Sequence, residues 1–170
     1  RGNQTQVFDE LQLAIVGDGD RRQISGSAKR LSASDEQWQF RMEADASILA
    51  SDWNGELSLR GRNVDRTYLT QILGLNRPQI PSGALDISIN SDWRAAKLQT
   101  ASFEVEVPKE KTDDLDALKV HGNIRRLKDG WSLGFLPEQF GNETYTRESA
   151  PMVRVRWLDN SARLAWAISD

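Results

Sequence analysis

Residues 37–48 read QWQFRMEADASI, and an apolar or small side chain occupies every second position from Trp38 to Ile48. Polar or charged residues fill the positions between them. Because successive side chains of a strand point to opposite faces, this pattern predicts a long β-strand with one apolar and one polar face. The pattern leaves open what covers the apolar face, which is either another part of the protein or a ligand.

The same alternation recurs along the chain, in LQLAI (11–15), ELSLR (56–60), ALDISIN (84–90), SFEVEV (102–107), around Gly122, in VRVRW (153–157) and in 164–168. Turn-forming residues separate these runs, at 17–20, 54–55, 90–92, 128–130 and 159–161. Roughly ten strands joined by short turns are expected, which is typical of an antiparallel meander. The predicted fold class is therefore mainly β, with a curved or trough-like sheet. A sandwich, in which the sheet folds onto itself, is the alternative.

One segment departs from the strand pattern. VDRTYLTQILGL, from Val64 to Leu75, has apolar residues at helical spacing, with Asp65 to cap its start and Gly74 to close its end. We predict a short helix near residues 65–74. The polar stretches 108–117 and 137–149 are predicted to be exposed loops. No domain boundary is evident, so residues 1–170 are treated as a single β-rich segment.

Charge and composition narrow the classes of function. The net charge is −3 and the basic residues are spread among acidic ones, which argues against binding to nucleic acid. There is no cysteine, which excludes thiol catalysis and disulfides, and no apolar run long enough to span a membrane. The chain starts without Met and ends in a strand-like run, so we expect it to be part of a longer protein.

The sequence offers few groups for catalysis. Glu104 and Glu106 share one face of a predicted strand, and paired carboxylates can hydrolyse glycosides, but these two alternate with apolar residues on an ordinary polar face. His121 is the single histidine and has no partner set by a motif. The acidic residues Asp113, Asp114 and Asp116 fit a solvated loop better than a metal site. We therefore predict no enzymatic activity, no metal and no cofactor.

Six tryptophans are many for this length. Trp38, Trp157 and Trp166 are in phase with the apolar faces, whereas the other three lie near predicted turns. Packing in the core and at strand ends is the favoured interpretation. Stacking on sugars, as in a carbohydrate-binding module, is the alternative.

A stretch of the chain resembles a known family. It comprises WNGELSLRGRNVDRTYLTQIL followed by IPSGALDISINSDWRAAKLQTASFEVEV, with Trp53 and Gly55 before one strand, a short helix, and Trp93 near the end of the next strand. This block resembles part of the YhdP family, within the AsmA-like group of bacterial envelope proteins.

The resemblance implies a large periplasmic protein anchored in the bacterial inner membrane. Its β-sheet would form a hydrophobic groove that carries phospholipid between the inner and outer membranes. The partners would be phospholipid acyl chains and neighbouring β segments of the same parent chain. The residues expected to line the groove are Trp38, Phe40, Met42, Ile48, Leu57, Leu59, Leu85, Ile87, Ile89, Phe103, Val105, Val107, Val153, Val155 and Trp157. A structural or interaction sandwich of an envelope protein is the alternative function.

Overall fold

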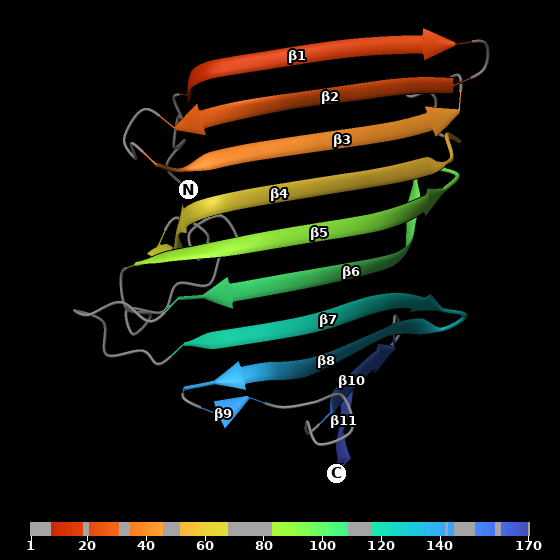
Figure 1. The fold of residues 1–170 in the computed structure, drawn as a ribbon. Coiled ribbons are helices and arrows are strands. Elements are labelled where there is room, and N and C mark those ends of the chain that lie inside the picture. The colour runs from red at the N-terminus through yellow and green to blue at the C-terminus, as the bar shows by residue number, and fades with distance from the viewer. Residues whose placement is uncertain are drawn as a thin grey trace.

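The chain forms one open antiparallel sheet in which strands that are neighbours in sequence are neighbours in space (Figure 1). The structure, a computed structural model, describes residues 8–18, 21–30, 35–45, 52–67, 83–108, 117–141, 143–144, 152–158 and 161–169. The strands are β1 (Phe8–Asp18), β2 (Arg21–Arg30), β3 (Gln37–Asp45), β4 (Gly55–Asp65), β5 (Ala84–Arg94), β6 (Lys97–Val107), β7 (Leu118–Leu127), β8 (Gly130–Phe140), β9 (Glu143–Thr144), β10 (Met152–Leu158) and β11 (Ser161–Ser169). The predicted mainly β antiparallel meander is confirmed.

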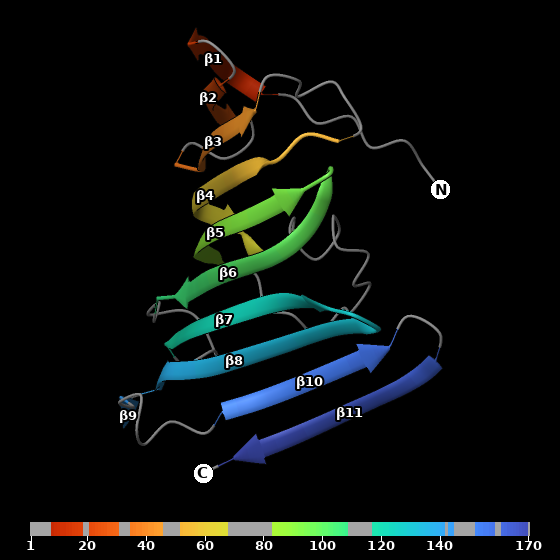
Figure 2. The same cartoon turned by 90° about the vertical axis from the view of Figure 1, so that its right-hand side faces the viewer.

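The sheet is twisted and not closed. Its order runs from β1 to β8 and then through β10 to β11, with the short β9 paired to the end of β8. The direction of the strands turns progressively from β1 to β11, as a comparison of Figures 1 and 2 shows. The described strands form one layer and no second sheet, so the sandwich alternative is not the arrangement they adopt.

The predicted helix is only partly within the described residues. β4 continues through Val64 and Asp65, and the helical turn begins at Arg66, directly after the predicted cap. Asp65 does act as its cap, because the backbone N–H of Thr67 donates to Asp65 Oδ1 at 2.8 Å. The remainder of the segment lies outside the described residues.

Two predictions about turns and loops were wrong. Residues 90–92 lie inside β5, and the chain turns instead at Ala95 and Ala96, which have φ angles of 49° and 54°. Positive φ angles at both central residues are typical of a type I′ turn, whose twist matches that of the two strands of a hairpin. The predicted loop 137–149 begins too early, because β8 extends to Phe140.

Hydrophobic burial is concentrated at one end of the sheet. Val64, Leu85 and Val107 are buried there, and Val64 is 0% exposed. Glu36 is also buried at this end, and its Oε1 accepts a hydrogen bond of 2.8 Å from the indole N–H of Trp38. The half-buried hydrophobic residues that pack against this cluster are Trp38, Ile87, Val105 and Leu118.

Aromatic rings lie over glycines of the neighbouring strands. Phe40 is opposite Gly26, and a Cβ on Gly26 would meet the Phe40 ring at 2.6 Å. Phe103 is opposite Gly122, where an added Cβ would overlap the ring directly. Each ring therefore occupies the space above a residue without a side chain and lies close to the backbone of the sheet.

Gly122→Val is expected to lower the free energy of unfolding by about 1–3 kcal/mol, because the new side chain displaces the Phe103 ring. Urea denaturation measures the change. Removing the ring with Phe103→Ala makes room for the valine, so the double variant should lose less stability than the sum of the two single variants. Additive losses would contradict the proposed contact.

Candidate functional site

The register of the sheet places most apolar positions of β1 to β8 and β10 on one face. Cross-strand partners share a face, so one apolar row can be followed from strand to strand. We call the central one the Phe40 row; it consists of Leu13, Gly26, Phe40, Leu59, Ile89, Phe103, Gly122, Phe135 and Val153. It crosses β1 to β8 and β10, a path of roughly 38 Å at a strand spacing of ~4.8 Å.

The residues predicted from sequence to line a groove fall on this apolar face where their side chains are described. Leu85 and Val107 belong to the buried cluster. Ile48 lies outside the described residues, and for Trp157 only the backbone is described, paired with Trp131. The others are half-buried: Trp38, Phe40, Met42, Leu57, Leu59, Ile87, Ile89, Phe103, Val105, Val153 and Val155.

Sequence reasoning missed part of this face. On the edge strand β1, Leu11, Leu13 and Ile15 are 70%, 58% and 65% exposed. Leu133 and Phe135 of β8 are cross-strand partners of Val155 and Val153. The alternation of WSLGF offered a signal for β8, whereas β2 is harder to recognise because Gly26 and small side chains interrupt its pattern.

Ser91 is a polar residue on the apolar face, and its hydroxyl is satisfied within the sheet. Ser91 Oγ donates to the carbonyl of Leu57 at 3.1 Å and accepts from the indole N–H of Trp93 at 3.0 Å. Because Ser91 is 8% exposed and its hydroxyl both donates and accepts a hydrogen bond, it adds little polarity to the surface.

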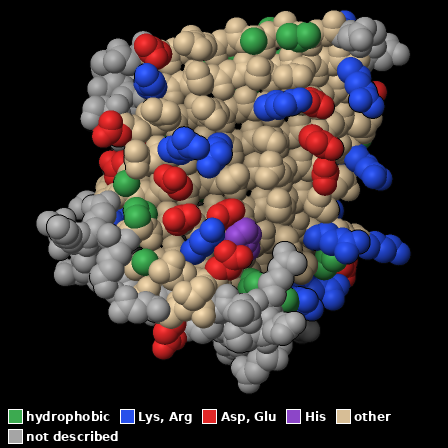
Figure 3. Space-filling model, viewed as in Figure 1, with side chains coloured by type: hydrophobic (Ala, Val, Ile, Leu, Met, Phe, Trp, Pro, Cys, Tyr) green, Lys and Arg blue, Asp and Glu red, His purple; other side chains and the backbone are tan. Residues whose placement is uncertain are grey.

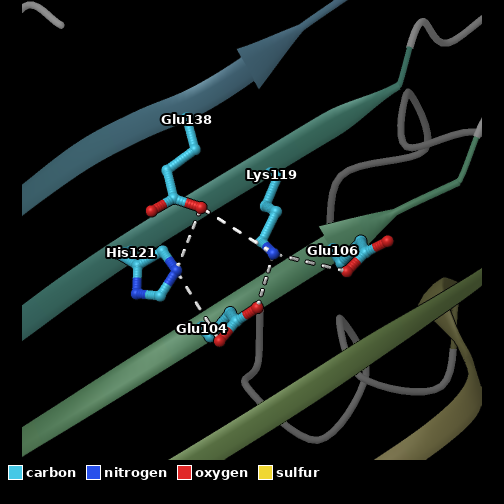
Figure 4. Close-up of polar contacts among 5 residues, drawn as sticks. All are labelled: Glu104, Glu106, Lys119, His121 and Glu138. Carbon is cyan, nitrogen blue, oxygen red and sulfur yellow. Dashed lines mark ion pairs between the residues drawn. The ribbon is translucent and has the colours of Figure 1, made fainter. Parts of the chain in front are cut away.

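The opposite face is polar, and Figure 3 shows charged side chains spread over it, with few hydrophobic ones. Its most connected group is drawn in Figure 4 and combines residues of β6, β7 and β8. Lys119 Nζ lies 3.1 Å from Glu104, 3.7 Å from Glu138 and 4.0 Å from Glu106. The hydrogen bond to Glu104, with the charge of that carboxylate, raises the pKa of Lys119 above its ordinary value.

His121 joins this cluster through the same carboxylates. Its Nε2 lies 3.2 Å from Glu138 and 3.6 Å from Glu104. Glu138 reaches it because the register shifts between Lys119 and Val120, which leaves Glu138 as the extra residue of a β-bulge. Sequence reasoning found no partner for His121, since a bulge cannot be read from alternation. The five side chains of this cluster are all partly exposed. Glu104 and Glu106, considered above as a catalytic pair, both form ion pairs with Lys119.

A hollow also lies on the polar side. It has a volume of about 650 Å³ across β1 to β5, and its polar lining includes Ser25, Arg41, Ser58, Arg60 and Asn90. Arg41 is already paired with Glu43. This hollow is open to solvent and brings together no nucleophile and base.

Among the described residues, no group of three or more His, Asp or Glu side chains is placed to hold a metal ion. No helix in the same residues is long and apolar enough to cross a membrane. Trp53 and Trp93 stack on each other at 5.5 Å and Arg126 covers Trp131 at 4.9 Å, so part of the ring surface of these three tryptophans is already in contact within the chain. No family model, no curated protein and no solved structure matches this chain.

Proposed function

We propose that this chain is a non-enzymatic segment of an AsmA-like periplasmic protein that holds phospholipid acyl chains on its apolar face. The observation that carries the proposal is the Phe40 row, which is apolar in every strand it crosses. Its length of roughly 38 Å exceeds the ~30 Å hydrocarbon thickness of a bilayer, so an acyl chain fits along it.

The energetics favour an apolar chain over water on this surface. The lining side chains are half-buried by their neighbours in the sheet, and Leu13 at the edge is 58% exposed. Each methylene removed from water contributes ~0.8 kcal/mol, so a chain lying over several strands offsets much of the cost of leaving a bilayer. Acyl chains would slide along the rows while the polar face remains in water, and no residue performs covalent chemistry.

The open edges suit a place within a longer sheet. Among the described strands, β1 pairs only with β2 and β11 only with β10. An unpaired edge offers its backbone N–H and C=O groups to another strand. Neighbouring β segments of the same parent chain are the proposed partners, and they would extend the apolar face in both directions. The parent would be anchored in the inner membrane.

Photocrosslinking tests the proposal. A photoreactive phenylalanine derivative at position 40 should crosslink to dispersed radiolabelled phospholipid, whereas the same residue at Gln39 should not. Gln39 is the matched control because it is adjacent in β3 and exposed on the polar face. Equal labelling at the two positions would reject an acyl-chain site on the apolar face.

A further inference from the structure

Two arginines lie on the apolar face, both at the same end of the sheet. At that end the chain turns between β1 and β2, β3 and β4, β5 and β6, and β7 and β8 (Figure 1). Among the described side chains of β1 to β8 and β10, Arg22 and Arg126 are the two charged residues at apolar-face positions, and no Asp or Glu shares that face with them. We call the cross-strand row of the apolar face nearest these turns the hairpin row; it includes Arg22, Ala44, Gly55, Trp93, Arg126 and Trp131.

The described strand carboxylates near these turns lie on the opposite, polar face. Asp45 is the cross-strand partner of Arg21, and Glu56 is that of Asp92. Because side chains alternate along a strand, Arg21 and Arg22 are adjacent in β2 but point to opposite faces. These carboxylates therefore share their face with cations such as Arg21, and the backbone of the sheet separates them from the hairpin row.

Both arginines of the hairpin row are half-buried and lie close against the sheet. A Cβ on Gly17 would meet Arg22 Cδ at 2.9 Å, so the stem of Arg22 covers the backbone of β1, and its Nη1 donates to the carbonyl of Arg21 at 3.3 Å. The Arg126 guanidinium lies over the ring of Trp131, 4.9 Å from its centroid. Stacking uses the flat side of a guanidinium, whereas its N–H donors point outward in its plane. Each arginine therefore keeps a charged, planar donor group at the margin of the apolar face.

The opposite end of the apolar face is closed by packing, because Val64, Leu85 and Val107 are buried there. The surface open to an acyl chain lies between this cluster and the hairpin row. A guanidinium that an acyl chain covers loses water, which costs free energy unless an anion takes the place of that water. The phosphate to which the chains of a phospholipid are linked is such an anion, and it forms charge-assisted hydrogen bonds with a guanidinium.

We propose that Arg22 and Arg126 bind the phosphate groups of the lipids whose chains lie on the apolar face. This assignment rests on the proposed function and adds the head group that the surface selects, which is a phosphate-bearing lipid over a neutral lipid with the same chains. The two arginines are on β2 and β7, five strand spacings or about 24 Å apart, so each binds a different lipid. Head groups then remain at the hairpin end of the sheet while the chains cross the strands.

Competition between two lipids with identical chains tests the assignment. The photoreactive residue is placed at position 40 or 103, on the strands that pair with those of Arg22 and Arg126. Its crosslink to radiolabelled phosphatidylglycerol is competed with unlabelled phosphatidylglycerol or with diacylglycerol, which has no phosphate. In the parent chain phosphatidylglycerol should compete about tenfold better. The variant Arg22→Gln/Arg126→Gln should lose most of this preference, with little change in competition by diacylglycerol.

The matched control is Arg21→Gln/Arg125→Gln, which removes the same charge from adjacent, exposed positions on the polar face. It should keep the preference for phosphatidylglycerol, and an equal loss in the two variants would overturn the assignment. Equal competition by the two lipids in the parent chain would also overturn it, and this comparison needs no variant to fold.

Glycerol phosphate carries the anion without the chains and should compete far less well than phosphatidylglycerol. Competition as strong as that of the lipid would indicate a site for free phosphate and would reject the assignment. Crosslinking without any preference between the lipids rejects the assignment alone. Absence of a crosslink at both positions rejects the proposed function and the assignment with it.

Discussion

Met42→Glu is expected to reduce lipid crosslinking at position 40 by about tenfold or more while the sheet remains folded. Met42 and Phe40 are on the same face of β3, and both are half-buried. If the face is open, a carboxylate at position 42 remains hydrated. The chain should then fold with only a modest fall in melting temperature. An acyl chain must displace that water, at a cost of several kcal/mol. A cost of ~1.4 kcal/mol already lowers the affinity for the chain tenfold.

Two variants make this result specific. Met42→Leu keeps the position apolar and should crosslink as the parent does. Gln39→Glu adds the same charge to the polar face of β3 and should also leave crosslinking unchanged. If Met42→Glu unfolds the chain, the face is a packed core and the acyl-chain proposal fails; crosslinking at the parent level in a folded Met42→Glu variant would also reject it.

Val64→Asp is expected to be the most destabilising single change, because Val64 is fully buried beside Leu85 and Val107. An unpaired carboxylate at such a site costs several kcal/mol, a large share of the ~5–15 kcal/mol that stabilises a typical domain. For a chain of this length, a loss of ~4 kcal/mol lowers the melting temperature by more than about 8 °C. Differential scanning calorimetry measures the shift.

The control for Val64→Asp is Arg62→Asp, since Arg62 is exposed two residues earlier in β4. It should change the melting temperature little. Val64→Ala removes two methyl groups without adding charge and should cost about 2 kcal/mol. Similar melting temperatures for Val64→Asp and Arg62→Asp would contradict the burial of this cluster.

Alternation in the sequence predicted the sheet well because each strand pairs in a register that keeps its apolar positions in phase. Phe40, Leu59 and Ile89 were each assigned a face from their own strand, and the register then places them side by side. A shift of one residue in any pair would reverse the face of a whole strand. The stronger the alternation of a strand, the more firmly its pairing is specified.

Turns and charge clusters were harder to predict. Residues 90–92 have turn-forming side chains but lie in β5, where Ser91 and Asn90 find hydrogen-bond partners across the sheet. The actual turn is made by two alanines, which carry no turn signal. The His121 contacts depend on the bulge at Glu138, and the Trp53–Trp93 stack joins residues 40 positions apart. These features arise from pairing between strands, which a local pattern does not contain.

The strict meander has a consequence for folding and for evolution. Every strand from β1 to β7 pairs only with the strands before and after it in sequence, so no contact in this part must wait for a distant segment. Hairpins can form locally and then join in any order, which favours fast assembly. Stability is then close to a sum of contributions from adjacent pairs, as in repeat proteins. A sheet of this kind can gain or lose a hairpin at an edge without repacking of its other strands. The extent of the sheet across its strands can therefore change during evolution to match the distance that it must cover.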